Sequence, residues 1–190
     1  MAVGLAAGFA VGLLLLIAGF VVLTTYNAIV GLRQRIDRAW ANIDVALKQR
    51  HDELPNLVAA VSGVMAFEGN VLELIAQVRA AYRPEDPVEQ QGANSEATSA
   101  AVRQLFAVVE RYPTLKSAAN VLALQVEVQR LEGVIADRRE LYNDTVYRYN
   151  ARISQLPAVL MAWLFAWQTR PFFATETNDR TSPEVGLRTA

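Results

Sequence analysis

The sequence predicts an all-α protein in which a single N-terminal transmembrane helix continues into an antiparallel up-and-down four-helix bundle with long helices. Three observations lead to this fold class. Residues 1–23 carry no charged or polar side chain. From Tyr26 onward, apolar residues recur at every third or fourth position, which is the spacing of one helix face. No segment alternates apolar and polar side chains as a half-buried strand does, so no β-sheet is expected.

The composition excludes several classes of function. The chain has 190 residues, enough for one ordinary domain, and its net charge of −1 argues against broad nucleic-acid binding. Without cysteine there is no disulfide, no thiolate nucleophile and no cysteine-based metal site. The single histidine, His51, excludes sites that need two histidines, such as the Glu-x-x-His pairs of di-iron bundles. We therefore expect no catalytic residues, no cofactor, no metal ion and no small-molecule substrate.

Residues 1–23 are predicted to form a membrane anchor. A helix of this length covers roughly 35 Å, more than a hydrocarbon core of about 30 Å. The alternative is a cleaved signal peptide, which begins with a basic region, but no Lys or Arg precedes the apolar segment. Arg33, Arg35 and Arg38 follow it closely. The positive-inside rule then predicts an N-terminus outside the cell and a cytoplasmic bundle.

Three glycines recur at every fourth position of the anchor: Gly4, Gly8 and Gly12. They line one stripe of the helix, and such small-residue stripes allow a second helix to approach closely in lipid. We interpret the stripe as a membrane helix-packing face. The alternative is that it reflects only the high glycine content of membrane helices.

The first two bundle helices are predicted at residues 26–51 and 53–82. Between them, Asp52 is suited to an N-cap and Pro55 to a first helical turn. The second helix carries a heptad seam from Leu57 to Tyr82, which is typical of a coiled coil. The alternative fold is one long hairpin in which the first two helices are fused across a kink at Pro55.

The other two bundle helices are predicted at residues 95–111 and 117–155, after a loop at residues 83–96. The loop contains two prolines, a glycine and four acidic residues, and Tyr112-Pro113 ends the third helix. Short turns between long helices indicate antiparallel neighbours, so the bundle is predicted to occupy residues 24–157.

Two turns of this topology are expected at the end of the bundle that lies far from the membrane. Five polar residues of these turns are the candidate contacts for a partner protein: His51, Asp52, Glu53, Tyr112 and Lys116. For His51, a solvated turn histidine is the better interpretation than a metal ligand.

The last bundle helix is expected to end at the lipid surface. The apolar aromatic segment at residues 158–173 is too short to span a bilayer and is predicted to lie in the membrane interface. Four of the residues around it favour that position: Trp163, Trp167, Arg152 and Arg170. The alternative is a cap that packs over the end of the bundle. Residues 174–190 are polar and are predicted to be disordered.

Three long segments resemble the signature of the LemA family of bacterial membrane proteins. They are YNAIVGLRQRIDRAWANIDVALKQRHDELPNLV (26–58), RYPTLKSAANVLALQVEVQRLEG (111–133) and LYNDTVYRYNARISQLP (141–157). The resemblance implies an N-terminal anchor followed by a helical bundle, with no general catalytic activity. Family members usually have His-Glu where this chain has Phe67-Glu68.

These features predict a membrane-anchored, non-catalytic interaction or scaffold protein of the bacterial inner membrane. The alternative is an accessory subunit of a larger membrane complex, held by its glycine-striped anchor. The expected partners are the lipid bilayer and a membrane or membrane-associated protein, or a second copy of the chain. No nucleic acid partner is expected.

Overall fold

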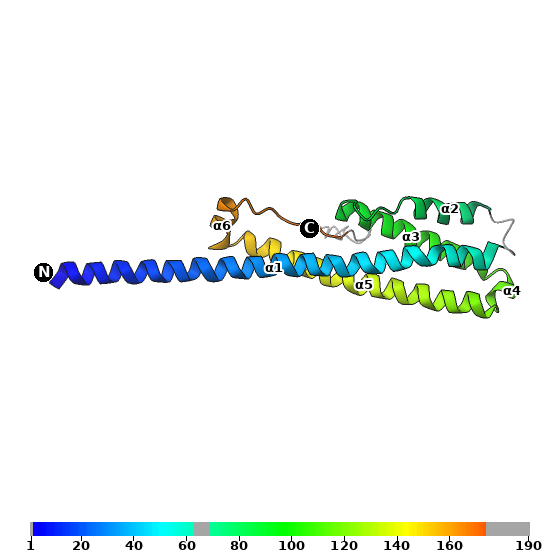
Figure 1. Cartoon of the computed structure of the whole chain (residues 1–190), viewed down its shortest axis with the longest axis horizontal. Coiled ribbons are helices and arrows are strands. Elements are labelled where there is room, and N and C mark those ends of the chain that lie inside the picture. The colour runs from blue at the N-terminus through cyan, green and yellow to red at the C-terminus, as the bar shows by residue number, and fades with distance from the viewer. Residues whose placement is uncertain (1, 63–68, 174–190) are drawn as a thin grey trace, which may run out of the picture. The chain divides into compact units, whose positions relative to one another are not determined.

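Figure 1 shows a computed structural model of the chain, which describes residues 2–62 and 69–173. The described residues form six helices and no strand, which confirms the all-α fold class. The helices are α1 (Ala2–Ser62), α2 (Gly69–Ala80), α3 (Val88–Val109), α4 (Pro113–Lys116), α5 (Ala119–Ile153) and α6 (Ala158–Leu164). The predicted disordered tail at residues 174–190 lies outside the described residues, as does Phe67-Glu68.

The chain divides into two compact units. Among the described residues, the first unit contains residues 2–46 and 133–172, and therefore the first part of α1, the second part of α5, and α6. The second unit contains residues 47–62, 69–132 and Phe173, with the end of α1, the helices α2, α3 and α4, and the start of α5. The single bundle predicted over residues 24–157 therefore corresponds to parts of both units.

Helix α1 continues through the position where a break was predicted. It has Pro55 in its interior and ends at Ser62, so the predicted turn at residues 51–55 and the N-cap at Asp52 are wrong. A proline inside a helix destabilises it by roughly 3 kcal/mol, because one backbone hydrogen bond is lost. Leu54, Leu57 and Val61 are at most 1% exposed. Burying each such side chain contributes about 1.5–3 kcal/mol, which outweighs the proline.

The helices after α1 agree with the sequence to different degrees. Helix α5, at Ala119–Ile153, matches the predicted helix at residues 117–155 to within two residues at each end. Helix α3 begins at Val88, seven residues before the predicted start at residue 95. The loop predicted at residues 83–96 is therefore shorter than expected, because its second half is helical.

Polar side chains at the start of α3 explain the shorter loop. Gln91 donates from Nε2 to the carbonyl oxygens of Pro84 (2.8 Å) and Asp86 (3.1 Å). Asn94 donates from Nδ2 to the carbonyl oxygen of Ala81 at 3.1 Å. These residues have the composition of a loop, but they lie on a helix and bind the loop that precedes it.

The second unit has one hydrophobic core, to which α1, α2, α3, α4 and α5 all contribute. Its buried members are Leu54, Leu57, Val61, Val71, Ile75, Val78, Ala101, Val102, Leu105, Val108, Val109, Leu115, Val121 and Val128. In the first unit, the buried apolar residues come from α1, α5 and the segment around α6.

Candidate functional site

The first part of α1 presents an exposed apolar surface. Every residue from Gly8 to Leu23 is exposed, with Phe9 at 78% and Leu16 at 73%. Within the described residues, α1 is the one helix long and apolar enough to cross a membrane. A continuous apolar surface of this length is not stable in water, so it indicates contact with lipid or with another apolar partner.

The glycine stripe is open in the described part of the chain. A side-chain carbon added at Gly8 or Gly12 would meet no other atom within 4 Å. No helix of this chain therefore packs against these two positions among the described residues. The surroundings of Gly4 lie outside the described side chains. The predicted packing face remains a prediction about a second chain.

Helix α6 has one packed face and one exposed apolar face. Ala158, Met161 and Ala162 are buried, whereas Leu160 and Trp163 are 66% and 85% exposed. The buried face agrees with the alternative of a cap, whereas the membrane-interface role of the exposed face stays a prediction.

Aromatic rings connect α6 to the end of the apolar segment of α1. The centroid of the Tyr26 ring lies 5.4 Å from that of Phe165 and 5.7 Å from that of Trp167. The rings of Phe165 and Trp167 stack on each other, with 5.2 Å between their centroids. Trp167 is therefore part of a cluster and half-buried, whereas Trp163 is exposed. The cluster brings α6 beside Tyr26, three residues after the exposed apolar run ends at Leu23.

Residues 167–173, the C-terminal strap, are bound along α5 by polar side chains. Asn150 accepts from the backbone N–H of Arg170 at 2.8 Å and donates to its carbonyl oxygen at 2.9 Å. The hydroxyl of Tyr149 donates to the carbonyl of Gln168 at 3.0 Å, and that of Tyr142 to the carbonyl of Pro171 at 3.1 Å. Because the two Arg170 bonds involve only its backbone, its side chain is available for other contacts.

The turn between α6 and the strap has a left-handed residue without glycine. Ala166 has φ 51°, and the backbone N–H of Trp167 bonds to the carbonyl of Ala162 at 2.9 Å. This is the arrangement of a Schellman cap, in which the left-handed position is usually glycine. Sequence reasoning missed the turn because that glycine is not there.

Ala166→Gly is expected to stabilise the turn, because glycine adopts a positive φ without the steric penalty of a Cβ atom. We expect a gain of about 0.5–1 kcal/mol, after allowing for the greater freedom of glycine in the unfolded chain. Hydrogen exchange of the Trp167 amide measures this gain. That amide donates the capping bond to the carbonyl of Ala162, so it should exchange more slowly in the variant. Unchanged or faster exchange would contradict the left-handed conformation.

The second unit contains a buried arginine that donates hydrogen bonds to three residues. Arg50 is 3% exposed and forms a salt bridge from Nη1 to Glu132 Oε1 at 2.8 Å. It also donates to the hydroxyl of Ser99 (2.8 Å) and, from Nη2, to the hydroxyl and carbonyl of Ser95 (2.9 and 3.2 Å). Ser99 in turn donates to Glu132 Oε2 at 2.7 Å. The buried charge of Arg50 is therefore paired with a partly buried counter-charge, as a buried ion requires.

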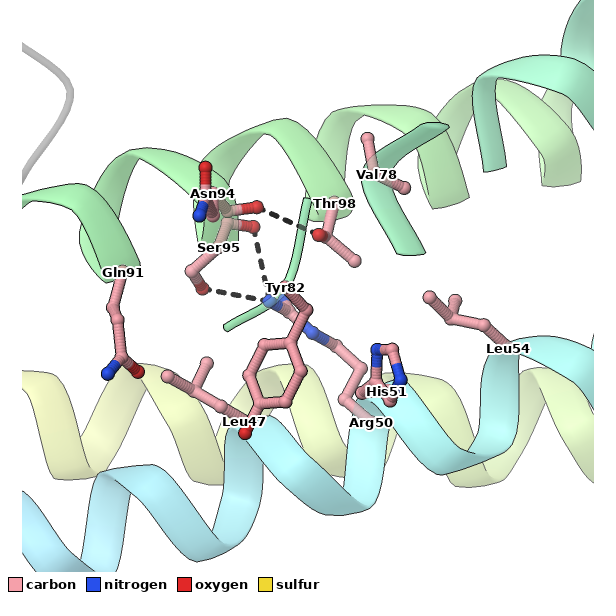
Figure 2. Close-up of a pocket in the computed structure, with 10 residues that line it drawn as sticks. All are labelled: Leu47, Arg50, His51, Leu54, Val78, Tyr82, Gln91, Asn94, Ser95 and Thr98. Atoms are coloured by element: carbon pink, nitrogen blue, oxygen red, sulfur yellow. Dashed lines mark hydrogen bonds between the residues drawn. The ribbon is translucent and has the colours of Figure 1, made fainter. Parts of the chain in front are cut away.

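A small cavity lies beside Arg50 (Figure 2). It has a volume of about 20 Å³, which is room for one water molecule. The buried Oε1 of Gln91, one of the lining residues, has no hydrogen-bond partner among the described residues. The cavity is lined by Leu47, Arg50, His51, Leu54, Val78, Tyr82, Gln91, Asn94, Ser95 and Thr98. It is too small for an organic substrate.

His51 lies at the edge of this cavity rather than in a turn. Its ring stacks on that of Tyr82 with 4.6 Å between centroids. Burial lowers the pKa of His51 from its usual value, Arg79 lowers it further, and Asp52 opposes the shift. The shift favours the neutral form of the imidazole. The turn expected at His51 is wrong, because α1 is helical there, but the side chain remains partly exposed.

The other predicted tip residues are divided between a helix and a turn. Asp52 and Glu53 lie inside α1, roughly 15 Å before its end at Ser62, at 1.5 Å per residue. Tyr112 and Lys116 flank and end the single-turn helix α4. The five residues predicted to contact a partner therefore do not all lie in turns. Among the described residues, no three His, Asp or Glu side chains are grouped as a metal site requires.

Comparison with known proteins gives one family and a few partial relatives. The profile described as "LemA family" matches residues 39–186, most of the chain. Magnetosome protein MamQ 2 of Paramagnetospirillum magneticum strain AMB-1 is 33% identical over 73 residues, and Magnetosome protein MamQ of Magnetospirillum gryphiswaldense strain MSR-1 is 30% identical over 73 residues. These stretches are 38% of this chain and 27% of each relative, so the chain matches only about a quarter of their length.

Proposed function

The chain belongs to the LemA family, and from this premise we propose that it is a membrane-anchored, non-catalytic interaction protein of the bacterial inner membrane. One observation carries the proposal. The exposed apolar residues from Gly8 to Leu23 are part of one unbroken helix, α1, whose later residues contribute to the packed cores of both units. Such a helix connects a lipid-facing segment to folded units, which is how a scaffold is attached to a membrane.

The polar groups of the second unit support a structural role. The Arg50 cluster is bonded within the chain: Arg50 donates to Ser95, Ser99 and Glu132, and Ser99 donates to Glu132. Ser99 and Glu132 also line an open pocket of about 480 Å³. A catalytic base needs a free carboxylate, whereas one oxygen of Glu132 pairs with Arg50 and the other accepts from Ser99. We therefore propose that this cluster determines helix register and takes part in no reaction.

The orientation proposed for the units is cytoplasmic. The first charged residue of the chain is Arg33, and Arg35 and Arg38 follow it on the same side of the apolar segment. Basic residues close to a membrane helix favour the cytoplasmic side. The N-terminus is then on the outer side of the membrane.

The exposed face of α6 supports a second contact with lipid. Leu160, Trp163 and Leu164 are exposed beside the aromatic cluster that joins α6 to Tyr26. Trp and Tyr side chains settle at the level of lipid headgroups. We therefore propose that α6 lies on the membrane surface close to the point where α1 leaves the bilayer.

Quenching by brominated lipid tests this second contact. In the full chain reconstituted into vesicles with lipids brominated near the headgroup, Trp163→Phe is expected to remove roughly half or more of the quenchable fluorescence, because an interfacial Trp lies within reach of the bromine atoms. Trp40→Phe is the matched control and should leave the quenching unchanged, since the Trp40 ring packs against Tyr142 at 5.7 Å. Equal quenching with and without Trp163 would contradict contact between α6 and lipid.

The glycine stripe supports a second candidate function, an accessory subunit of a membrane complex. Gly8 and Gly12 have open space around them, which a helix of another protein can fill. Mild solubilisation followed by purification separates the two candidates. A companion present in a fixed ratio favours the accessory subunit, whereas a chain that purifies alone favours the independent scaffold.

A further inference from the structure

A second cavity, in the first unit, lies between α1, α5 and the turn after α6. Its volume is about 190 Å³, roughly six times the space that one water molecule takes in the liquid. The side chains that matter for its chemistry are Arg33 from α1, Tyr149 from α5, and Phe165, Trp167 and Arg170 from the turn and the strap. We propose that this cavity binds the phosphate group of an anionic membrane lipid.

The charges around the cavity favour an anion. Its walls contain two guanidinium groups, Arg33 and Arg170, and no carboxylate. Arg33 has no carboxylate within 4 Å among the described residues. Arg170 reaches only Asp37, at 3.9 Å, and Asp37 is 67% exposed to solvent. Both guanidinium groups therefore have free N–H donors, which match the oxygens of a phosphate group.

The cavity lies where a lipid headgroup is expected. No charged residue precedes Arg33 in the sequence, so the uncharged part of α1 extends to the cavity. Side chains of a helix lean toward its N-terminus, and the Arg33 side chain therefore extends toward the membrane end of α1. Phe165 and Trp167, two walls of the cavity, form the aromatic cluster with Tyr26. Aromatic belts of this kind mark the headgroup level.

A lipid explains more of these features than free phosphate does. The cavity has room for a phosphate group but not for a whole lipid. The acyl chains of a lipid bound there would extend along exposed apolar side chains nearby, such as Leu160 and Leu164 on α6. Free phosphate would gain nothing from that apolar surface.

The proposal rests on the membrane attachment proposed above, so its test avoids vesicles. The full chain in a neutral detergent is titrated with short-chain phosphatidylglycerol, with the matching phosphatidylcholine and with inorganic phosphate. The fluorescence of Trp167 reports binding, in a background that carries Trp40→Phe and Trp163→Phe. We expect saturable binding of phosphatidylglycerol, and weaker binding of phosphatidylcholine and of inorganic phosphate.

Arg33→Gln and Arg170→Gln are each expected to weaken phosphatidylglycerol binding about tenfold or more, because each removes charged hydrogen bonds to the phosphate. Neither should unfold the chain, since the strap is held through the backbone of Arg170. Arg35→Gln is the matched control, because Arg35 is exposed on the same helix and does not line the cavity. The Arg35→Gln variant should bind phosphatidylglycerol with the same affinity as the parent chain.

Four results would overturn the proposal. The first two are an absence of saturable phosphatidylglycerol binding and equal affinity for phosphatidylcholine. The third is displacement of bound phosphatidylglycerol by an equal concentration of inorganic phosphate. The fourth is a loss of phosphatidylglycerol affinity in Arg35→Gln as large as that in Arg33→Gln and Arg170→Gln. Failure of the proposed membrane contact is distinguishable, because it would appear as equal quenching with and without Trp163 in vesicles while binding to the cavity in detergent persists.

Discussion

Glu132→Ala is expected to lower the free energy of unfolding by about 3 kcal/mol, because it leaves the charge of Arg50 buried without its counter-ion. Arg50 is 3% exposed, and it keeps hydrogen bonds to Ser95 and Ser99 in the variant. Glu132 is one-third exposed, so we take the lower end of the range for buried pairs. Urea denaturation of the detergent-solubilised chain, followed by far-UV circular dichroism, measures the change.

Glu127→Ala is the matched control for this prediction. Glu127 lies on the same helix and forms a salt bridge with Arg130 at 2.6 Å, but both side chains are exposed. Surface pairs of this kind contribute little, because water and salt screen them. We expect its denaturation midpoint to remain close to that of the parent. Equal midpoints for Glu132→Ala and Glu127→Ala would contradict a buried, paired Arg50.

Pro55→Ala is expected to raise the free energy of unfolding by about 2 kcal/mol. Alanine is favoured over proline by roughly 3 kcal/mol inside a helix, and about 0.4–1 kcal/mol of that is offset because proline also restricts the unfolded chain. The gain follows from the position of Pro55 inside α1. Alanine supplies the missing backbone N–H to the carbonyl of His51. The shift of the urea midpoint at constant slope measures it.

Pro113→Ala provides the comparison for Pro55→Ala. Pro113 occupies the first position of α4, where no helical hydrogen bond is lost, so its replacement should change stability by less than about 0.5 kcal/mol. If Pro55→Ala behaved in the same way, Pro55 would begin a helix, as the sequence analysis predicted. A clear gain at position 55 alone supports the uninterrupted α1.

Much of the fold could be predicted from the sequence because helices have local signatures. The all-α class follows from the 3.6-residue period and is confirmed, as is membership of the LemA family. The ends of α5 follow from the same period to within two residues. The four-helix arrangement as a whole stays a prediction, and so do the membrane roles of the glycine stripe and of Trp163.

The candidate sites were predicted only in part. Trp167 and Arg170 were identified from their types and their position near an apolar segment. The partners that position them were not, because Tyr142 and Tyr149 also fit the apolar seam of α5, and nothing in their spacing indicates that their hydroxyl groups bind the strap. The Arg50 cluster was missed as well. One signal was available, the four-residue spacing of Ser95 and Ser99 among alanines on α3.

The sequence by itself determined the properties that depend on neighbouring residues, namely the uncharged apolar segment, the helical period and the family. Only the tertiary structure decided whether α1 breaks at Pro55 and whether Arg50 is buried. Both outcomes depend on residues far away in the chain. Arg50 and Glu132 are 82 positions apart, and Leu57 is buried in a core to which five helices contribute. The physical reason is that a local preference of a few kcal/mol is smaller than the burial and pairing energy that distant segments supply when they pack together.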